Sequence, residues 1–350
     1  MSAARASGKG LRRLLVPVLL AAGALAGSVA VAEFVARWSD LGGANYYRDV
    51  NRYFKGALEL APGPDEVSPT GRIFQHKPGV DLEFSPFRFC TDARGLRAAA
   101  PSSELAAPGL RSRVLCLGDS VTLAWGVDDA ESWPRLVERD GRSADGRALE
   151  CLNAGHLMYD TVQEQRLLAA WGPELRPEIV LVTFLMNDLN PTWDQLQPAQ
   201  NSAAPQPKLA DPGFLGALLP RSCYALRALL GTWNLKREPS SYDAASNARR
   251  LFTPNAWPRA RAALDRMLVT CGELGARLAV ADHTDPPLPE LVDWCNKRGV
   301  PCFPARFSAE EQRRGLANSW IDAHANALGN RLLADKMLAG LRQAGLLAPE

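Results

Sequence analysis

The stretch Val114–Gly126, with the sequence VLCLGDSVTLAWG, decides the fold that we expect for this chain. It begins with an apolar run, Val114–Leu117, which ends abruptly at Gly118. A short continuous apolar run of this kind indicates a strand that is buried on both faces, as in a parallel sheet. Gly118-Asp119-Ser120 then supplies residues that favour turns and helix caps. The stretch therefore predicts a central strand, a tight turn and the start of a helix.

Ser120 would lie at the carboxyl end of this strand, which is where open α/β sheets bind their ligands. Its backbone N–H can stabilise a developing oxyanion, and its hydroxyl can attack a carbonyl group once a base is near. The alternative is that Asp119 or Ser120 only caps a helix. These three residues do not separate the two interpretations, so the rest of the chain has to decide between them.

Beyond residue 113 the chain alternates short apolar runs with amphipathic stretches. The predicted strands are Val114–Leu117, Ala148–Leu152, Ile179–Phe184, Arg277–Ala281 and a short one near Pro301–Phe303. The predicted helices are residues 132–139, 161–171, 258–274, 289–297 and 326–344. Apolar strands that alternate with helices indicate a parallel sheet with helices on both faces. We therefore expect an α/β domain over residues 112–350, with three α/β/α layers and a five-stranded parallel sheet.

Two segments do not follow this alternation. Residues 39–111 are rich in Gly and Pro, and we expect a linker followed by a small cap with strands near 80–84 and 87–90. Residues 190–257 form an insertion that is rich in Gln and Pro at first and then predicts a helix around Tyr224–Trp233. Insertions of this length at the carboxyl edge of a sheet are often lids or substrate-binding elements, and a disordered loop is the alternative.

Residues 1–38 have the composition of a membrane segment. The first thirteen residues include the basic residues Arg5, Lys9, Arg12 and Arg13 and no acidic residue. The run from Leu14 to Ala32 carries no charge. That run is about as long as a hydrocarbon core of ~30 Å requires, and the basic flank favours an N-terminus inside the cytoplasm. Ala30-Val31-Ala32 leaves open a cleaved signal peptide, but the apolar run past Glu33 favours an uncleaved anchor. Both interpretations place the rest of the chain in the periplasm or outside the cell, tethered or secreted.

The composition is that of an ordinary globular protein. The net charge is +2, and no basic stripe interleaved with aromatic residues indicates nucleic-acid binding. The seven cysteines form no CxxC pair and show no spacing typical of metal ligands, so we expect no metal site. Cys116 and Cys151 lie in predicted strands, whereas Cys295 and Cys302 are close enough in sequence to form a disulfide in an oxidising compartment.

Three further polar segments adjoin the predicted sheet. Asn153-Ala154-Gly155-His156 follows the second strand, and Leu185-Met186-Asn187-Asp188 follows the third. Asp322-Ala323-His324-Ala325-Asn326 comes just before the last predicted helix. Together with Gly118-Asp119-Ser120, these segments are four loops that we expect at one edge of one sheet.

In these four blocks the chain resembles the SGNH hydrolase family, also called GDSL, whose blocks supply a serine, a glycine, an asparagine and a histidine. The resemblance covers about residues 113–341, and Trp125-Gly126-Val127 is similar to membrane-anchored bacterial members. It implies a flavodoxin-like fold and a serine esterase that works through an acyl-serine intermediate without a cofactor. The expected location suggests a cell-envelope glycan or a lipid ester as the substrate, and a small-molecule ester is also open.

The resemblance assigns a role to each matching residue. Ser120 is the nucleophile, His324 is the base, and Asp322 holds the imidazole in the required tautomer. The expected oxyanion donors are the N–H groups of Ser120 and Gly155 and the side-chain amide of Asn187. Asp119 and Asp188 are expected to support the site. His156 and His283 also follow predicted strands and are rival candidates for the base, whereas His76 lies outside the predicted domain.

The last block departs from the family pattern. The family usually has Asp-x-x-His, but here Asp322 and His324 are only two residues apart. Side chains two apart face the same way only in extended backbone, so we expect this pair in a loop rather than in the helix. Ala325 stands where a proline is common, and Asn326 is the expected N-cap of the last helix.

Other functions are open on this sequence. The same residues would serve an O-acyltransferase if an alcohol replaced water as the acceptor. A catalytically inactive binding module with this fold is a third possibility, although the complete set of Ser120, Asn187 and His324 argues against it. A turn that binds phosphate is a fourth, but Asp119 would repel the anion.

Overall fold

The structure is a computed structural model that describes residues 3–60, 74–107, 109–189, 256–319 and 321–349. Almost all of the predicted insertion 190–257, including the predicted helix around Tyr224–Trp233, lies outside the described residues, as do residues 61–73 of the predicted linker. The chain divides into two units. The first contains residues 1–47, 208–238 and 319–321, and the second contains residues 48–207, 239–318 and 322–350.

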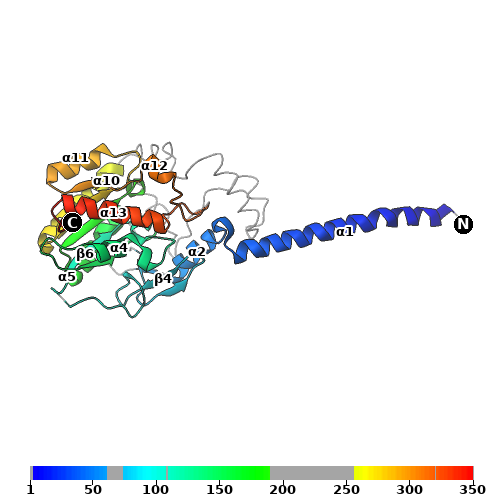
Figure 1. Cartoon of the computed structure of the whole chain (residues 1–350), viewed down its shortest axis with the longest axis horizontal. Coiled ribbons are helices and arrows are strands. Elements are labelled where there is room, and N and C mark those ends of the chain that lie inside the picture. Colours follow the sequence, from blue (N-terminus) through cyan, green and yellow to red (C-terminus); the bar gives the residue numbers. More distant parts are fainter. Residues whose placement is uncertain (1–2, 61–73, 108, 190–255, 320, 350) are drawn as a thin grey trace. The chain divides into compact units, whose positions relative to one another are not determined.

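The first unit contains the long helix α1 (Ala3–Trp38) and the short helix η1 (Leu41–Gly43) (Figure 1). Residues Leu15–Trp38 of α1 are long and apolar enough to span a membrane, and none of its most apolar window is buried by the protein. Leu19, Leu20 and Leu25 are each about two-thirds exposed, at 66%, 69% and 67%. A helix that is apolar all round without packing against protein is typical of a segment that lies in lipid.

The second unit is built on an eight-stranded sheet with the order β10-β9-β8-β6-β7-β5-β4-β3. Its parallel strands are β6 (Ser112–Leu117), β7 (Leu149–Asn153), β8 (Ile179–Phe184), β9 (Arg277–Asp282) and β10 (Cys302–Pro304). These are the predicted strands, each within two residues at either end, so the expected five-stranded parallel sheet is confirmed. Every residue of β6 and of β8 is buried, which explains the apolar runs Val114–Leu117 and Ile179–Val182 within them.

The sheet continues beyond the parallel strands into the segment where we expected a separate cap. The added strands are β3 (Asp81–Glu83), β4 (Arg88–Thr91) and β5 (Arg97–Ala98), all antiparallel. Strand β5 joins the parallel part through a single pair, Arg97 with Asn153 of β7. These strands are only two to four residues long, so their sequences carry too little periodicity to indicate a pairing partner. Strands β1 (Leu58–Leu60) and β2 (Phe74–His76) form a separate antiparallel pair.

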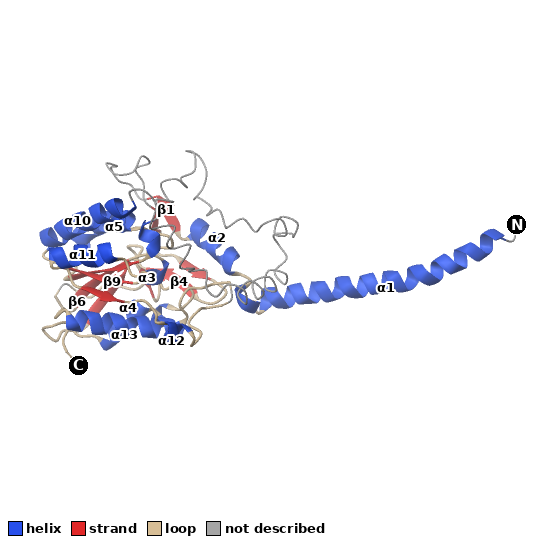
Figure 2. Cartoon of the chain, turned by 90° about the horizontal axis from the view of Figure 1, so that it is seen from above, coloured by secondary structure: helices blue, strands red, loops and turns tan. Residues whose placement is uncertain are grey.

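Helices cover both faces of the parallel strands (Figure 2). One face packs against α5 (Thr161–Leu175), α10 (Ala256–Leu274) and α11 (Pro289–Arg298), and the other packs against α4 (Trp133–Asp140) and α13 (Ala327–Gln343). The remaining helices are α2 (Tyr46–Gly56), α3 (Ser120–Leu123), α12 (Ala309–Gln312), η2 (Asp129–Glu131) and η3 (Met186–Leu189). Two apolar cores, one on each side of the sheet, therefore hold the three layers together.

The cysteines of the described residues are free thiols. Cys116 and Cys151 are buried in β6 and β7, as expected. Cys295 of α11 and Cys302 of β10 lie in hydrogen-bond contact, which raises the pKa of the Cys295 thiol. The proposed disulfide between these two residues is therefore not formed here, although their side chains are adjacent.

Candidate active site

Ser120 begins a one-turn helix, α3, directly after the central strand β6. Gly118 links them with a φ of 155°, and a Cβ at this position would lie 2.1 Å from the Oγ1 of Thr122. Asp119 is the N-cap of α3, because its Oδ1 accepts a hydrogen bond from the N–H of Val121 at 2.9 Å. Within the described residues the N–H of Ser120 makes no hydrogen bond.

Asp119 connects the loops that follow β6 and β8. Its Oδ2 accepts a hydrogen bond from Nδ2 of Asn187 in η3 at 2.5 Å and a long one from Oγ of Ser120 at 3.5 Å. Burial raises the pKa of this carboxyl group, while the hydrogen bonds from Val121 and Asn187 and the charge of His324 act in the opposite direction. The second N–H of the Asn187 amide is not used by Asp119. It therefore remains able to donate to a substrate.

Gly155 follows β7 and packs against the backbone of α3. A Cβ at this position would lie 2.2 Å from the backbone nitrogen of Leu123 and 2.6 Å from the carbonyl carbon of Thr122, so only glycine fits. Its N–H, which we expected to stabilise the oxyanion, donates to Oδ1 of Asn153 at 3.1 Å in this structure. Gly155 thus lies beside α3, which begins at Ser120, and its one N–H has a partner within its own turn.

Asp322 and His324 form a close pair. Nδ1 of His324 lies 2.5 Å from Oδ1 of Asp322, and the backbone N–H of His324 donates to the same oxygen at 3.1 Å. The pair lies in a loop that is closed by an antiparallel bridge between Ala317 and Ala325. Residues 322–324 belong to no helix, as expected, and α13 begins only at Ala327. Asn326 then caps α13 by accepting from the N–H of Gly329 at 3.0 Å.

The imidazole of His324 is electrostatically coupled to both acidic neighbours. Burial lowers the pKa of His324, but the charge of Asp322, the hydrogen bond to Asp322 and the charge of Asp119 outweigh burial, so the pKa is raised. The charge of His324 in turn lowers the pKa of Asp119. Asp119 contacts both Ser120 and Asn187, so these contacts join the serine and asparagine blocks, while His324 acts on Asp119 through its charge.

The rival histidines are engaged elsewhere. Nδ1 of His156 lies 2.9 Å from the carbonyl oxygen of Ala154, and its Nε2 accepts from the backbone N–H of His76 at 3.1 Å. Both ring nitrogens are thus occupied in a neutral imidazole, and burial lowers the pKa of His156 to about 4. Nδ1 of His283 lies 3.0 Å from the carbonyl oxygen of Ala305, and burial lowers its pKa as well. His156 therefore has no free nitrogen to take a proton from Ser120, and within the described residues no hydrogen bond joins His283 to Ser120 or Asp119.

His76, outside the predicted domain, belongs to a buried stack next to Gly155. Its ring lies 3.8 Å from that of His156 at an interplanar angle of 11°, and His156 in turn stacks on Tyr159 at 4.3 Å. The hydroxyl of Tyr53 in α2 lies 2.6 Å from Nε2 of His76. The stack fixes the turn that contains Gly155. Sequence reasoning missed it because its members come from three distant segments.

Asp188 and Glu164 lie behind the site. Asp188 accepts from the hydroxyl of Thr161 at 2.9 Å and from the N–H of Leu185 at 2.6 Å, so it closes the turn that carries Asn187. Glu164 of α5 is fully buried, and neither of its carboxyl oxygens has a hydrogen-bond partner among the described residues. Burial, with the charges of Asp188 and Asp119, raises the pKa of Glu164 well above its usual value. The described residues contain no group of three His, Cys, Asp or Glu side chains that could hold a metal ion.

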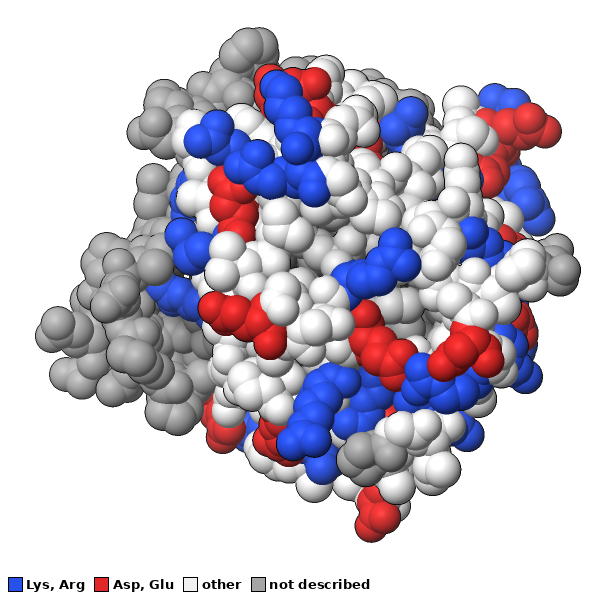
Figure 3. Space-filling model, turned by 90° about the vertical axis from the view of Figure 1, so that its left-hand side faces the viewer, with Lys and Arg blue, Asp and Glu red and all other residues white. Residues whose placement is uncertain are grey.

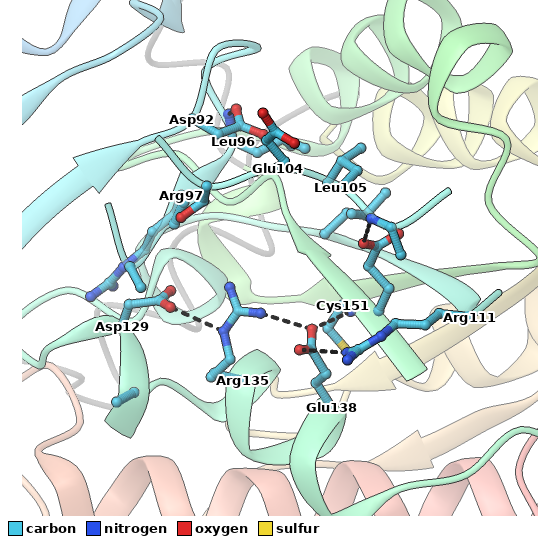
Figure 4. A pocket seen from close by; sticks show the side chains of 17 residues that line it. Asp92, Leu96, Arg97, Glu104, Leu105, Arg111, Asp129, Arg135, Glu138 and Cys151 are labelled. Carbon is cyan, nitrogen blue, oxygen red and sulfur yellow. Dashed lines mark hydrogen bonds and ion pairs between the residues drawn. The ribbon is translucent and has the colours of Figure 1, made fainter. Parts of the chain in front are cut away.

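A separate cavity of about 610 Å³ lies beside β5, β7 and α4 (Figure 4). Along one side, Arg135 bridges Asp129 at 3.0 Å and Glu138 at 2.8 Å, and Arg111 approaches Glu138 at 3.5 Å. These charges neutralise one another within the wall. Arg97 also lines the cavity, but no residue of the candidate active site does.

Comparison with solved structures finds similar folds at low sequence identity. An esterase from Pseudoalteromonas is 13% identical with a TM-score of 0.40, over 66% of this chain and 97% of that chain. A member of the lipolytic protein G-D-S-L family from Veillonella parvula is 12% identical with a TM-score of 0.37, over 65% and 97%. An acetylxylan esterase from Geobacillus stearothermophilus is 13% identical with a TM-score of 0.34, over 66% and 94%.

No family model matches the sequence, and no curated protein matches it. The identities and TM-scores of the similar structures are low. The assignment of the site therefore rests on the geometry of this chain.

Proposed function

We propose that this protein is a serine esterase of the SGNH/GDSL type, with Ser120 as the nucleophile and the Asp322–His324 pair as its base. The observation that carries the proposal is the position of this pair. Nδ1 of His324 lies 2.5 Å from Oδ1 of Asp322, and its pKa is raised in part by the charge of Asp119, which itself contacts Ser120 and Asn187. A serine, a histidine held by a carboxylate and an amide donor at one sheet edge are the parts that acyl transfer needs.

The reaction that we propose has two halves. The hydroxyl of Ser120 turns from Asp119 toward His324 and attacks the ester carbonyl carbon, while Nε2 of His324 takes the hydroxyl proton. The tetrahedral intermediate then expels the alcohol, which receives that proton, and an acyl-Ser120 ester remains. Water attacks this ester with the same imidazole as base, and the acid product and free Ser120 are released. Asp322 keeps the proton of His324 on Nδ1, so that Nε2 is the atom that takes the proton of Ser120.

Two donors are free to stabilise the oxyanion. The N–H of Ser120 has no partner in the described residues, and the Asn187 amide has a second N–H besides the one that Asp119 accepts. Removing one such donor typically costs about 10²–10³ in rate. The N–H of Gly155 contributes only if it leaves Oδ1 of Asn153, which it contacts at 3.1 Å.

The proposed substrate class follows from the N-terminal helix. Residues Leu15–Trp38 have the length and composition of a membrane span, and we propose that they anchor the enzyme with its site outside the cytoplasm. An enzyme fixed at that surface meets esters of the cell envelope, either acylated glycans or lipids. Small esters are the convenient probes for its nucleophile.

The experiment that tests this function compares full-length wild type and Ser120→Ala in detergent. Both are treated with a fluorophosphonate probe and with p-nitrophenyl acetate. We expect labelling and turnover in the wild type and a loss of at least about a thousandfold in Ser120→Ala. Ser102→Ala is the matched control because Ser102 is exposed and lies outside the site. A folded wild type that neither reacts with the probe nor hydrolyses the ester contradicts the proposal.

The same assay distinguishes hydrolysis from acyl transfer. It is repeated with a sugar acceptor, and the products are identified by mass spectrometry. Free acetate in both conditions supports a hydrolase. Acetylated sugar as the main product would show that an alcohol replaces water at the acyl-Ser120 stage.

A further inference from the structure

The side-chain amide of Asn318 touches two parts of the candidate site. Its Nδ2 donates to the carbonyl oxygen of Trp125 at 3.1 Å and to Oδ2 of Asp322 at 3.1 Å. A carbonyl and a carboxylate only accept hydrogen bonds, so the nitrogen of the amide and not its oxygen must face them. One side chain therefore joins the segment after the nucleophile to the acid that holds the histidine.

The Trp125 end of this link belongs to the turn that begins at Ser120. The N–H of Trp125 donates to the carbonyl oxygen of Ser120 at 3.1 Å, so the Trp125 peptide closes the single turn of α3. Gly126 follows with a φ of 97°, and a Cβ there would lie 1.7 Å from Nδ2 of Asn318. A side chain at position 126 would displace the amide. The Trp125-Gly126 pair thus makes room for Asn318.

The other end fixes the Asp322–His324 pair. Oδ1 of Asp322 accepts a hydrogen bond from His324, and Oδ2 accepts one from the side-chain amide of Asn318. Each carboxylate oxygen therefore has a defined donor. The backbone N–H of Asn318 also donates to the carbonyl oxygen of His324 at 2.8 Å. Asp322 is only 4% exposed, and a buried carboxylate depends strongly on such donors. Asn318 therefore holds the carboxylate and the backbone of the histidine at once.

We propose that Asn318 is a positioning residue that fixes the Asp322–His324 pair against the turn that starts at Ser120. The inference rests on the proposed function, since it explains how the base is aligned with the nucleophile. Asn318 acts through Asp322 and Trp125 and not on the reacting atoms. A displacement of about 1 Å in such an alignment can cost on the order of 10² in rate.

The first test measures the titration of His324 by NMR of histidine-labelled protein, and it does not depend on activity. The chain has four histidines, and burial lowers the pKa values of His76, His156 and His283. The signal that titrates at the highest pH is therefore that of His324, whose pKa is raised. In Asn318→Asp a second carboxylate faces the pair, so we expect the midpoint to move to higher pH by about one pH unit.

The second test measures the rate of fluorophosphonate labelling in Asn318→Ala. We expect about a tenfold slower reaction at the pH where labelling is fastest, in a variant whose thermal unfolding still shows a folded protein. Asn296→Asp is the matched control, because Asn296 is exposed on α11 and should change neither readout.

The two tests separate failure of the inference from failure of the proposed function. An unshifted His324 midpoint in Asn318→Asp, or wild-type labelling in folded Asn318→Ala, overturns the role of Asn318. A wild type that the probe does not label overturns the esterase, but the NMR titration still reports whether Asn318 faces the pair. If Asn318→Ala does not fold, the midpoint in Asn318→Asp decides alone.

Discussion

At the scale of single residues, the proposed nucleophile Ser120 faces a buried carboxyl group. Oγ of Ser120 lies 3.5 Å from Oδ2 of Asp119, at the limit for a hydrogen bond. Catalytic contacts are often long in the absence of substrate and tighten only in the complex. The proposed mechanism needs the Ser120 side chain to rotate from Asp119 toward His324. Asp119 has two structural roles, because it caps α3 and accepts a hydrogen bond that orients Asn187.

Glu164 leads to a prediction about stability. Its pKa is raised in the folded protein, so the folded state keeps a proton that the unfolded chain releases above about pH 4.3. The stabilising contribution of the neutral acid is therefore complete below that pH and is lost as the pH rises. Glu164→Gln removes this dependence, and we expect it to be more stable than the wild type at pH 8 by about 1 kcal/mol or more.

The measurement is urea unfolding of both proteins at pH 5 and pH 8. The free energy of unfolding of Glu164→Gln should exceed that of the wild type by more at pH 8 than at pH 5. Glu310→Gln is the control, because Glu310 is exposed and its substitution should leave that difference near zero at both values. A Glu164→Gln protein that loses stability equally at both pH values would mean that the carboxyl group is ionised and has a partner.

At the scale of elements, strand β5 supports helix α3, which begins at the proposed nucleophile Ser120. The buried guanidinium of Arg97 donates to the carbonyl oxygens of Leu123, Ala124 and Val127, which end and follow α3. The last carbonyls of a helix have no partner within it, and a cation is favourable at that end. The guanidinium of Arg97 also lies 5.6 Å from the ring centre of Phe87, in the turn between β3 and β4.

We predict that Arg97→Met destabilises the protein by about 3 kcal/mol, because three buried carbonyls lose their donor. Arg97→Lys keeps the charge, but one ammonium group does not reproduce the planar guanidinium, so an intermediate loss is expected. The free energy of unfolding in urea gives both values. Arg313→Met serves as the control, since Arg313 is exposed. Equal stability of Arg97→Met and wild type would refute this role of β5.

At the scale of the whole molecule, charge is evenly mixed over the surface that Figure 3 shows. Basic and acidic side chains lie next to each other on this face, with uncharged residues between them. Ion pairs such as Arg147 with Glu178 at 2.7 Å are exposed, and such pairs contribute only about 0–1 kcal/mol each. A mixed face of this kind does not attract a polyanion by long-range electrostatics.

The N-terminal helix leads to the prediction at this scale. We expect the full-length chain to stay with membranes after an alkaline carbonate wash and to keep its N-terminus, as mass spectrometry would show. Leu25→Arg places a charge near the middle of the span, which costs about 2.5–3.5 kcal/mol of insertion free energy and should release part of the protein. Leu25→Ala is the control. A mature chain that begins at Glu33 would instead show cleavage after Ala30-Val31-Ala32.

The sequence by itself determined the parallel sheet, the helices around it and the order of the four polar loops. Strands that are buried on both faces are mostly apolar, and the helices between them are amphipathic. The pattern of buried and exposed residues is therefore visible in short stretches of the sequence. Ser120, Asn187 and the Asp322–His324 pair could be proposed as the site because each adjoins such an element and lies in a block that resembles the SGNH family. The fold and the edge that carries the site were predictable for the same reason.

Only the tertiary structure decided how these loops meet. The contact of Asp119 with Asn187, the link from Asn318 to Trp125 and the stack of His76 on His156 join residues that are far apart in sequence. The pairing of β5 with β7 is of the same kind. Such contacts depend on distances and directions between elements, which arise when the layers pack and leave no periodic signal in the sequence.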